Sequence, residues 1–129
     1  MKTYWDSSAL VEAVNDDRVR RRLIAGGGLT RTHSLSEVFS TMTGGKMGDR
    51  VSVKEAAHTV AQLAGDLDFC DLTAPEILRA LAQAESKGVR GERVHDYLHA
   101  VVAHKGKAGL ILTADKHGFD GIFPSVELV

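Results

Sequence analysis

Four acidic residues stand where predicted strands end or predicted helices begin: Asp6, Glu37, Asp96 and Asp115. In an open sheet of parallel strands these positions meet at the carboxyl edge, where ligands bind. Carboxylates gathered there repel one another unless a cation lies between them, and Mg2+ or Mn2+ is the usual hard cation with oxygen ligands. The sequence therefore predicts a Mg2+ or Mn2+ site at this edge.

The elements that would position these residues alternate between strands and helices. Strands are predicted at residues 2–5, 29–32, 69–72 and 110–112, with 126–129 as a candidate fifth, and helices at 9–15, 16–25, 34–43, 53–64, 74–87 and 92–104. Residues 110–112 are apolar without interruption, which is typical of a parallel strand buried on both faces. The alternation predicts a single domain over residues 1–129, a three-layer α/β/α sandwich around a mostly parallel sheet of about four or five strands.

Size and composition indicate an ordinary globular protein. The chain has 129 residues, of which 43% are hydrophobic and 26% charged, so a disordered or fibrous class is not expected. The apolar stretches are too short to cross a bilayer and the N-terminus does not resemble a signal peptide, so we expect a cytoplasmic protein without a membrane partner. The single cysteine, Cys70, excludes an internal disulfide and a thiolate zinc framework, and we expect it in the core.

Each acidic residue also has a purely structural interpretation. Ser34 precedes Glu37 by three residues, the spacing of a capping box. Asp6 could cap the first helix, although Ser7 or Ser8 is also suited to that role. Asp96 could be a surface residue, and Asp115 a turn residue. These interpretations stay open, but taken one by one they do not explain why all four acidic residues are predicted at the same sheet edge.

The histidines and the aromatic residues are assigned to other roles. His95 lies about 100° around the helix from Asp96, so a shared ligand role is not expected. We place His33, His99, His104 and His117 at the surface or at the edge of a substrate site, since their spacing matches no metal-ligand pattern. Trp5 and Phe119 are expected in the core, because aromatic side chains are common core fillers.

Taken in order, these segments resemble a PIN domain, and at this length the VapC toxin of a bacterial or archaeal toxin–antitoxin pair. The resemblance spans nearly the whole chain. It rests on the segments Asp6-Ser7-Ser8-Ala9-Leu10, Ser36-Glu37-Val38, Val94-His95-Asp96 with Ala100, and Leu112-Thr113-Ala114-Asp115 with Phe119. Two departures from the family pattern are Trp5, where an aliphatic residue is more usual, and Lys116-His117, where a further acidic residue often follows. The second departure leaves open whether one or two metals are held.

The resemblance implies a Mg2+- or Mn2+-dependent endoribonuclease that is inhibited by a small cognate antitoxin and is usually a homodimer. By position, Asp6, Glu37, Asp96 and Asp115 match the family's acidic set, and Ser8 and Thr113 match polar positions beside it. The residue types fit this chemistry, since a metal held by Asp6 and Asp96 would activate water and neutralise charge on the scissile phosphate. Glu37 and Asp115 would complete a second metal site or orient the water.

RNA would have to bind through a local basic surface, because the formal net charge is only −1. The residues expected to form it are Lys46, Arg90 and Arg93, and the arginines at 18 and 20–22 are expected to be a solvated helix face. Two other functions remain open. One is a PIN fold that binds RNA or an antitoxin without cutting, and the other, which the residues after Asp6 favour less, is a phosphotransfer α/β domain.

Overall fold

The computed structural model describes residues 2–44 and 51–129. Within these ranges the chain forms a five-stranded sheet in the order β3-β2-β1-β4-β5, and every neighbouring pair of strands runs parallel. The strands are β1 (Thr3–Trp5), β2 (Gly28–Thr30), β3 (Leu67–Phe69), β4 (Leu110–Thr113) and β5 (Val126–Leu128). A parallel pair needs a long crossover connection, and between the first four strands pairs of helices supply it.

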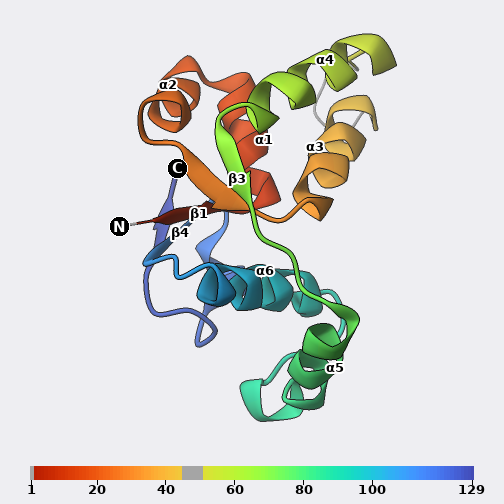
Figure 1. Ribbon diagram of the computed structural model, residues 1–129, viewed down its shortest axis with the longest axis vertical. Coiled ribbons are helices and arrows are strands. Elements are labelled where there is room, and N and C mark those ends of the chain that lie inside the picture. The colour runs from red at the N-terminus through yellow and green to blue at the C-terminus, as the bar shows by residue number, and fades with distance from the viewer. Residues whose placement is uncertain (1, 45–50) are drawn as a thin grey trace.

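Helices cover both faces of this sheet. Figure 1 shows α1 (Ser7–Asn15), α2 (Asp17–Gly26), α3 (His33–Thr43) and α4 (Val53–Ala64) on one face, with α5 (Ala74–Ala82) and α6 (Arg93–Lys105) on the other. Two short 3-10 helices, η1 (Glu85–Lys87) and η2 (Lys116–Phe119), follow α5 and β4. The predicted three-layer α/β/α sandwich with a parallel sheet is thereby confirmed.

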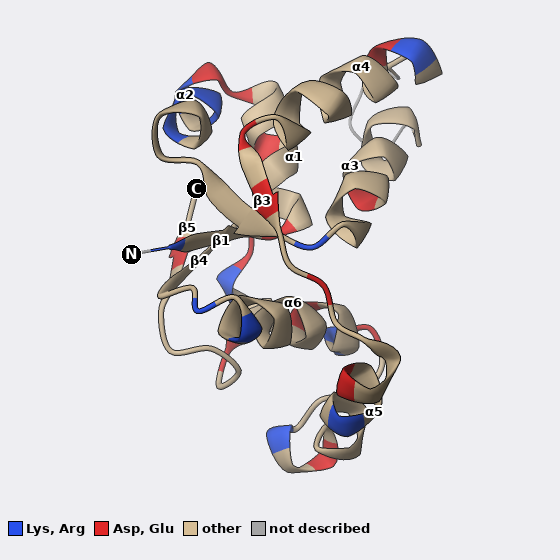
Figure 2. Ribbon diagram, in the orientation of Figure 1, with Lys and Arg blue, Asp and Glu red and all other residues tan. Residues whose placement is uncertain are grey.

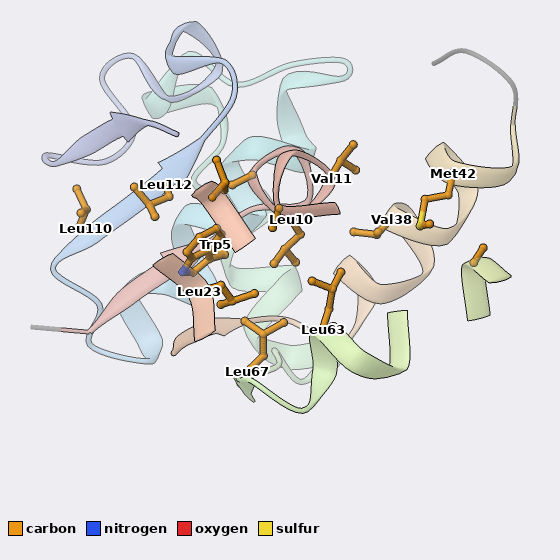
Figure 3. Packing of buried hydrophobic residues seen from close by; sticks show 14 residues of the cluster. Trp5, Leu10, Val11, Leu23, Val38, Met42, Leu63, Leu67, Leu110 and Leu112 are labelled. Carbon is orange, nitrogen blue, oxygen red and sulfur yellow. The ribbon is translucent and has the colours of Figure 1, made fainter. Parts of the chain in front are cut away.

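Adjacent residues of β1 enter opposite layers of the core, because strand side chains alternate between the two faces. Trp5 is 1% exposed and packs with Leu10 and Leu23 under α1–α4, as Figure 3 shows. Tyr4 is fully buried in the other layer, among residues of α6. Gly28 of β2 makes room for the indole, since a Cβ there would lie 2.6 Å from Trp5 Nε1. The glycine thus accommodates an aromatic residue where an aliphatic one was expected.

The position of β1 fixes where a ligand site can form. From β1 the chain crosses to β2 on one side, while β4 lies on the other, so the strand order reverses between β1 and β4. In such sheets the crevice at the carboxyl ends of the strands at this reversal is the usual binding place. The backbone N–H of Asp6 donates to Leu112 O at 3.1 Å, which continues the pairing of β1 with β4 by one residue. Asp6 and the residues after Leu112 therefore lie together at this carboxyl edge.

Some local expectations were wrong. β3 runs from Leu67 to Phe69 instead of 69–72, and its last two residues are exposed because it is an edge strand. Ser34 and Glu37 form no capping box: α3 starts at His33, and its N-cap, Thr32, makes no side-chain cap bond. The helix expected at 74–87 ends at Ala82. No helix in residues 2–44 or 51–129 combines the length and the apolar character that crossing a bilayer requires.

Candidate functional site

Asp6 follows β1 directly and is 4% exposed. Its backbone is extended, and its Oδ1 accepts hydrogen bonds from Ala9 N at 2.8 Å and from Ser8 Oγ at 2.7 Å. Asp6, and neither Ser7 nor Ser8, is therefore the N-cap of α1, a role that suits aspartate. Asp6 can be both a helix cap and a site residue, because capping fixes its carboxylate at the sheet edge.

Ser8 and Thr113 tie the start of α1 to the end of β4. Their hydroxyl oxygens lie 3.1 Å apart, and Ser8 Oγ also accepts from Ala114 N at 2.9 Å. Thr113, which is 1% exposed, accepts from Asp115 N at 3.1 Å through Oγ1. These bonds connect Asp6 to the 113–115 turn through hydroxyl groups. The two polar residues thus position the acidic residues on either side of them.

Asp96 on α6 and Asp115 in the turn after β4 lie at the same carboxyl edge, close enough for the charge of Asp96 to act on Asp6 and that of Asp115 on Asp96. Asp96 is half-buried against Gly118 of η2, where a Cβ would lie 2.7 Å from Asp96 Cγ. Asp115 is exposed and caps η2, since its Oδ1 accepts from His117 N at 3.0 Å. Glycine at position 118 therefore leaves room for the Asp96 carboxylate beside Asp115.

The carboxylates influence one another electrostatically. Burial raises the pKa of Asp6 above its ordinary value, and the charge of Asp96 adds to this effect. The pKa of Asp96 is likewise raised, first by burial and then by the charges of Asp115 and Glu37. Raised pKa values at carboxyl groups that face like charges mean that ionisation is costly without a counter-charge. The structure thus brings all four predicted acidic residues into one electrostatic group.

Glu37 lies on α3 at the rim of this group, surrounded by donors. Its Oε2 accepts from Ser7 Oγ at 3.0 Å, and its Oε1 accepts from Arg31 Nη2 at 3.3 Å. The Nε2 atoms of His99 and His33 lie 3.6 and 3.9 Å from the same Oε1. Glu37 is therefore held by residues of α1, α3, α6 and the segment after β2.

A sequence model described as PIN domain matches residues 3–122 of the chain. The chain belongs to the PIN domain family. The crystal structure of PAE2754 from Pyrobaculum aerophilum superposes on it with a TM-score of 0.69 over 100% of this chain and 91% of that chain, at 18% sequence identity. At this identity the superposition shows the shared fold alone. Comparison with curated proteins finds no significant match.

PIN domains are typically metal-dependent nucleases, so we tested whether the residues of this PIN domain fit a divalent cation. Within residues 2–44 and 51–129 no three His, Cys, Asp or Glu side chains converge closely enough to hold one ion directly. Mg2+, however, usually binds through one or two carboxylates and keeps several waters. The buried carboxylate of Asp6 and the half-buried carboxylate of Asp96, with raised pKa values and space left by Gly118, fit this mode of binding.

Sequence reasoning missed the residues that hold Glu37. Arg31 follows β2 at the same carboxyl edge, and the strand-end rule would have found it had it been applied to basic residues. His99 was expected at the surface or at the edge of a substrate site, and the surface alternative is wrong, since the residue is 2% exposed. It lies three residues after Asp96, and residues three apart share one face of a helix. That spacing was the available signal.

The residues expected to contact RNA are in different situations. Arg90 is exposed, whereas Arg93 donates through Nη2 to the backbone oxygen of Asp120, and Lys46 lies outside the described residues. Figure 2 shows α2 as a basic helix at the other end of the molecule from α5. Its basic charge is partly neutralised, because Arg20 pairs with Asp66 at 2.9 Å and Arg22 with Glu127 at 3.5 Å.

Proposed function

We propose that this PIN domain is a Mg2+- or Mn2+-dependent endoribonuclease and the toxin of a VapBC-type toxin–antitoxin pair. The observation that carries the proposal is the electrostatic group of Asp6, Glu37, Asp96 and Asp115 at the strand-order reversal. A cation there relieves repulsion among the carboxylates and attracts the phosphate that is cleaved.

The residues would divide the work as follows. Asp6 and Asp96 would hold the cation, and the Ser8 hydroxyl keeps Asp6 in place through its bond to Oδ1. When bound, the cation lowers the pKa of a water and neutralises charge on the scissile phosphate. Glu37 orients the attacking water and Asp115 completes the acidic rim. The water oxygen bonds to phosphorus, and the bond to the leaving ribose oxygen breaks.

The partners follow from the same proposal. The substrate is RNA, the inhibitor is a small antitoxin protein, and the protein acts in the cytoplasm as a homodimer. Support for a protein partner comes from α5, where Leu78 is 66% and Leu81 43% exposed. Apolar side chains that stand together at the surface are typical of protein interfaces.

A PIN fold that binds RNA or an antitoxin without cutting is the second candidate. It is favoured by the separation of the carboxylates, since no three of the described acidic, histidine or cysteine side chains converge on one point. A phosphotransfer domain has no such support, because the PIN domain model matches residues 3–122.

Metal-dependent cleavage distinguishes the first two candidates. The purified protein is incubated with a structured RNA in Mg2+ or Mn2+ and, in parallel, in chelator. We expect cleavage only with metal and a loss of about 100-fold in Asp96→Asn, as removing groups of a metal site usually costs at least 10–100-fold. Asp68→Asn on the exposed end of β3 makes the same chemical change away from the site and should cut normally. An Asp96→Asn protein that cuts at the wild-type rate would refute the assignment.

A further inference from the structure

A buried tyrosine–histidine pair lies directly behind Glu37. Tyr4 is fully buried and His99 is 2% exposed, and the Tyr4 hydroxyl lies 2.6 Å from His99 Nδ1. The two rings meet edge to face with their centroids 5.5 Å apart. His99 Nε2, on the far side of the ring, is buried without a hydrogen-bond partner among the described residues. A buried N–H without a partner is costly, so this atom calls for an explanation.

The protonation of the pair follows from its surroundings. Burial lowers the pKa of His99 to about 3, with Arg31, His33 and His95 contributing in the same direction, so the imidazole is neutral. A phenol is protonated at neutral pH, so the Tyr4 hydroxyl has a hydrogen to donate. A neutral imidazole carries one N–H and one acceptor nitrogen. If the Tyr4 hydroxyl donates to Nδ1, the ring proton is on Nε2.

The carboxylate in front of the ring selects the same tautomer. Glu37 Oε1 lies 3.6 Å from His99 Nε2. A lone pair on Nε2 would face the negative oxygen, whereas an N–H there is attracted to it. At 3.6 Å the contact is longer than a hydrogen bond, but hydrogen bonds in sites without ligands are often long and shorten when the site is occupied.

We propose that Tyr4 and His99 are positioning residues for Glu37. The Tyr4 hydroxyl fixes His99 in the Nε2–H tautomer, and this N–H directs the Glu37 carboxylate, whose other contacts are Ser7, Arg31 and His33. His99 is not a metal ligand in this arrangement, because a protonated Nε2 has no lone pair to offer. The functional part of the inference rests on the proposed nuclease activity, in which Glu37 orients the water.

The first test needs no activity. Long-range 15N–1H NMR of the metal-free protein reports which ring nitrogen of His99 carries the proton, and we expect Nε2–H. The Nε2–H signal should shift in Glu37→Gln, because the charge it faces is removed. The matched control is Glu76→Gln, where the lost charge pairs with Lys105 on the far side of α6, and the signal should stay. An Nδ1–H tautomer, or a signal that Glu37→Gln leaves unchanged, would overturn the proposal.

The second test compares two buried tyrosines. Tyr4→Phe removes only the hydroxyl that fixes the tautomer, and we expect about a ten-fold lower cleavage rate at saturating Mn2+. Tyr97→Phe removes an equally buried hydroxyl, which donates to Ala80 O at 2.8 Å away from the site, and should retain the rate. Equal rates in both variants would overturn the positioning role. If the wild type cleaves nothing, the proposed nuclease function fails, and the NMR result still decides the tautomer.

Discussion

Lowering the pH from 7.5 to 5.0 should destabilise the fold through His99. The pKa of this imidazole is lowered from 6.5 to about 3 in the folded protein, chiefly by burial. As the pH falls below 6.5, the unfolded chain takes up a proton that the folded protein does not, so the free energy of unfolding falls. At pH 5.0 the loss is about 2 kcal/mol, worked as RT ln(1 + 10^1.5), and it stops growing near pH 3.

The measurement is urea unfolding at both pH values for wild type and for His99→Gln, whose amide does not titrate. The raised pKa values of Asp6 and Asp96 act with the opposite sign, because stability then falls as the pH rises through their unfolded values. They are present in both proteins and cancel in the difference, which should change by about 2 kcal/mol.

A control variant removes a histidine without a burial cost. His58→Gln on the exposed face of α4 should lose as much stability as wild type between the two pH values. If His99→Gln and wild type lose the same free energy, the imidazole is protonated inside the fold. The argument for a neutral, buried His99 would then be wrong.

Three further outcomes are expected. Asp6→Asn should raise the stability of the metal-free protein, because the buried charge is removed while the Asn side chain can still cap the helix. In melting curves the variant should also lose the stabilisation by Mn2+, which is about 2.7 kcal/mol at a concentration of 100 times Kd. A stabilisation by Mn2+ that persists in the variant would contradict the site. Gly118→Ala should displace the Asp96 carboxylate and weaken Mn2+ binding about ten-fold, as measured by calorimetry. Gly26→Ala, where a Cβ meets open space, should leave the affinity unchanged. Equal affinities in the two variants would show that Gly118 is not needed to leave room for Asp96. Arg90→Gln should flatten the salt dependence of RNA binding in fluorescence anisotropy by about one ion. If the α2 arginines control that slope instead, RNA crosses the other side of the molecule.

The positions of Asp6 and Asp115 could be predicted because strand ends are visible in the sequence. Tyr4 and Trp5 alternate between two core layers, and Asp6 follows where the alternation ends. The same reasoning failed for β3, because both Asp68 and Phe69 are exposed at the sheet edge and no alternation marks the strand. The pattern of apolar residues identifies strands that are buried on both faces, whereas edge strands give a weaker signal.

The surroundings of Glu37 could not be predicted in this way. Apart from His33, four residues before it on α3, its contacts come from Ser7, Arg31 and His99, which lie on three separate segments. Only a tertiary arrangement brings these donors together. His99 is a different case, because its place three residues after Asp96 puts both residues on one face of α6, and that spacing was not used.

The position of Ser34 shows how tertiary contacts determine whether Glu37 closes a helix cap or contributes to the candidate site. A local pattern would pair Ser34 with Glu37 in a capping box, but Ser34 is buried and its hydroxyl oxygen lies 2.7 Å from Thr30 Oγ1, within hydrogen-bond distance. Thr30 in turn donates to Trp5 O at 2.8 Å, the carbonyl just before Asp6. Because Ser34 is bonded within the core, it does not form a capping box with Glu37. The Glu37 carboxylate instead accepts hydrogen bonds from Ser7 and Arg31. The hydrogen bonds that Thr30 of β2 makes to Trp5 and Ser34 therefore also leave the Glu37 carboxylate available to the candidate site.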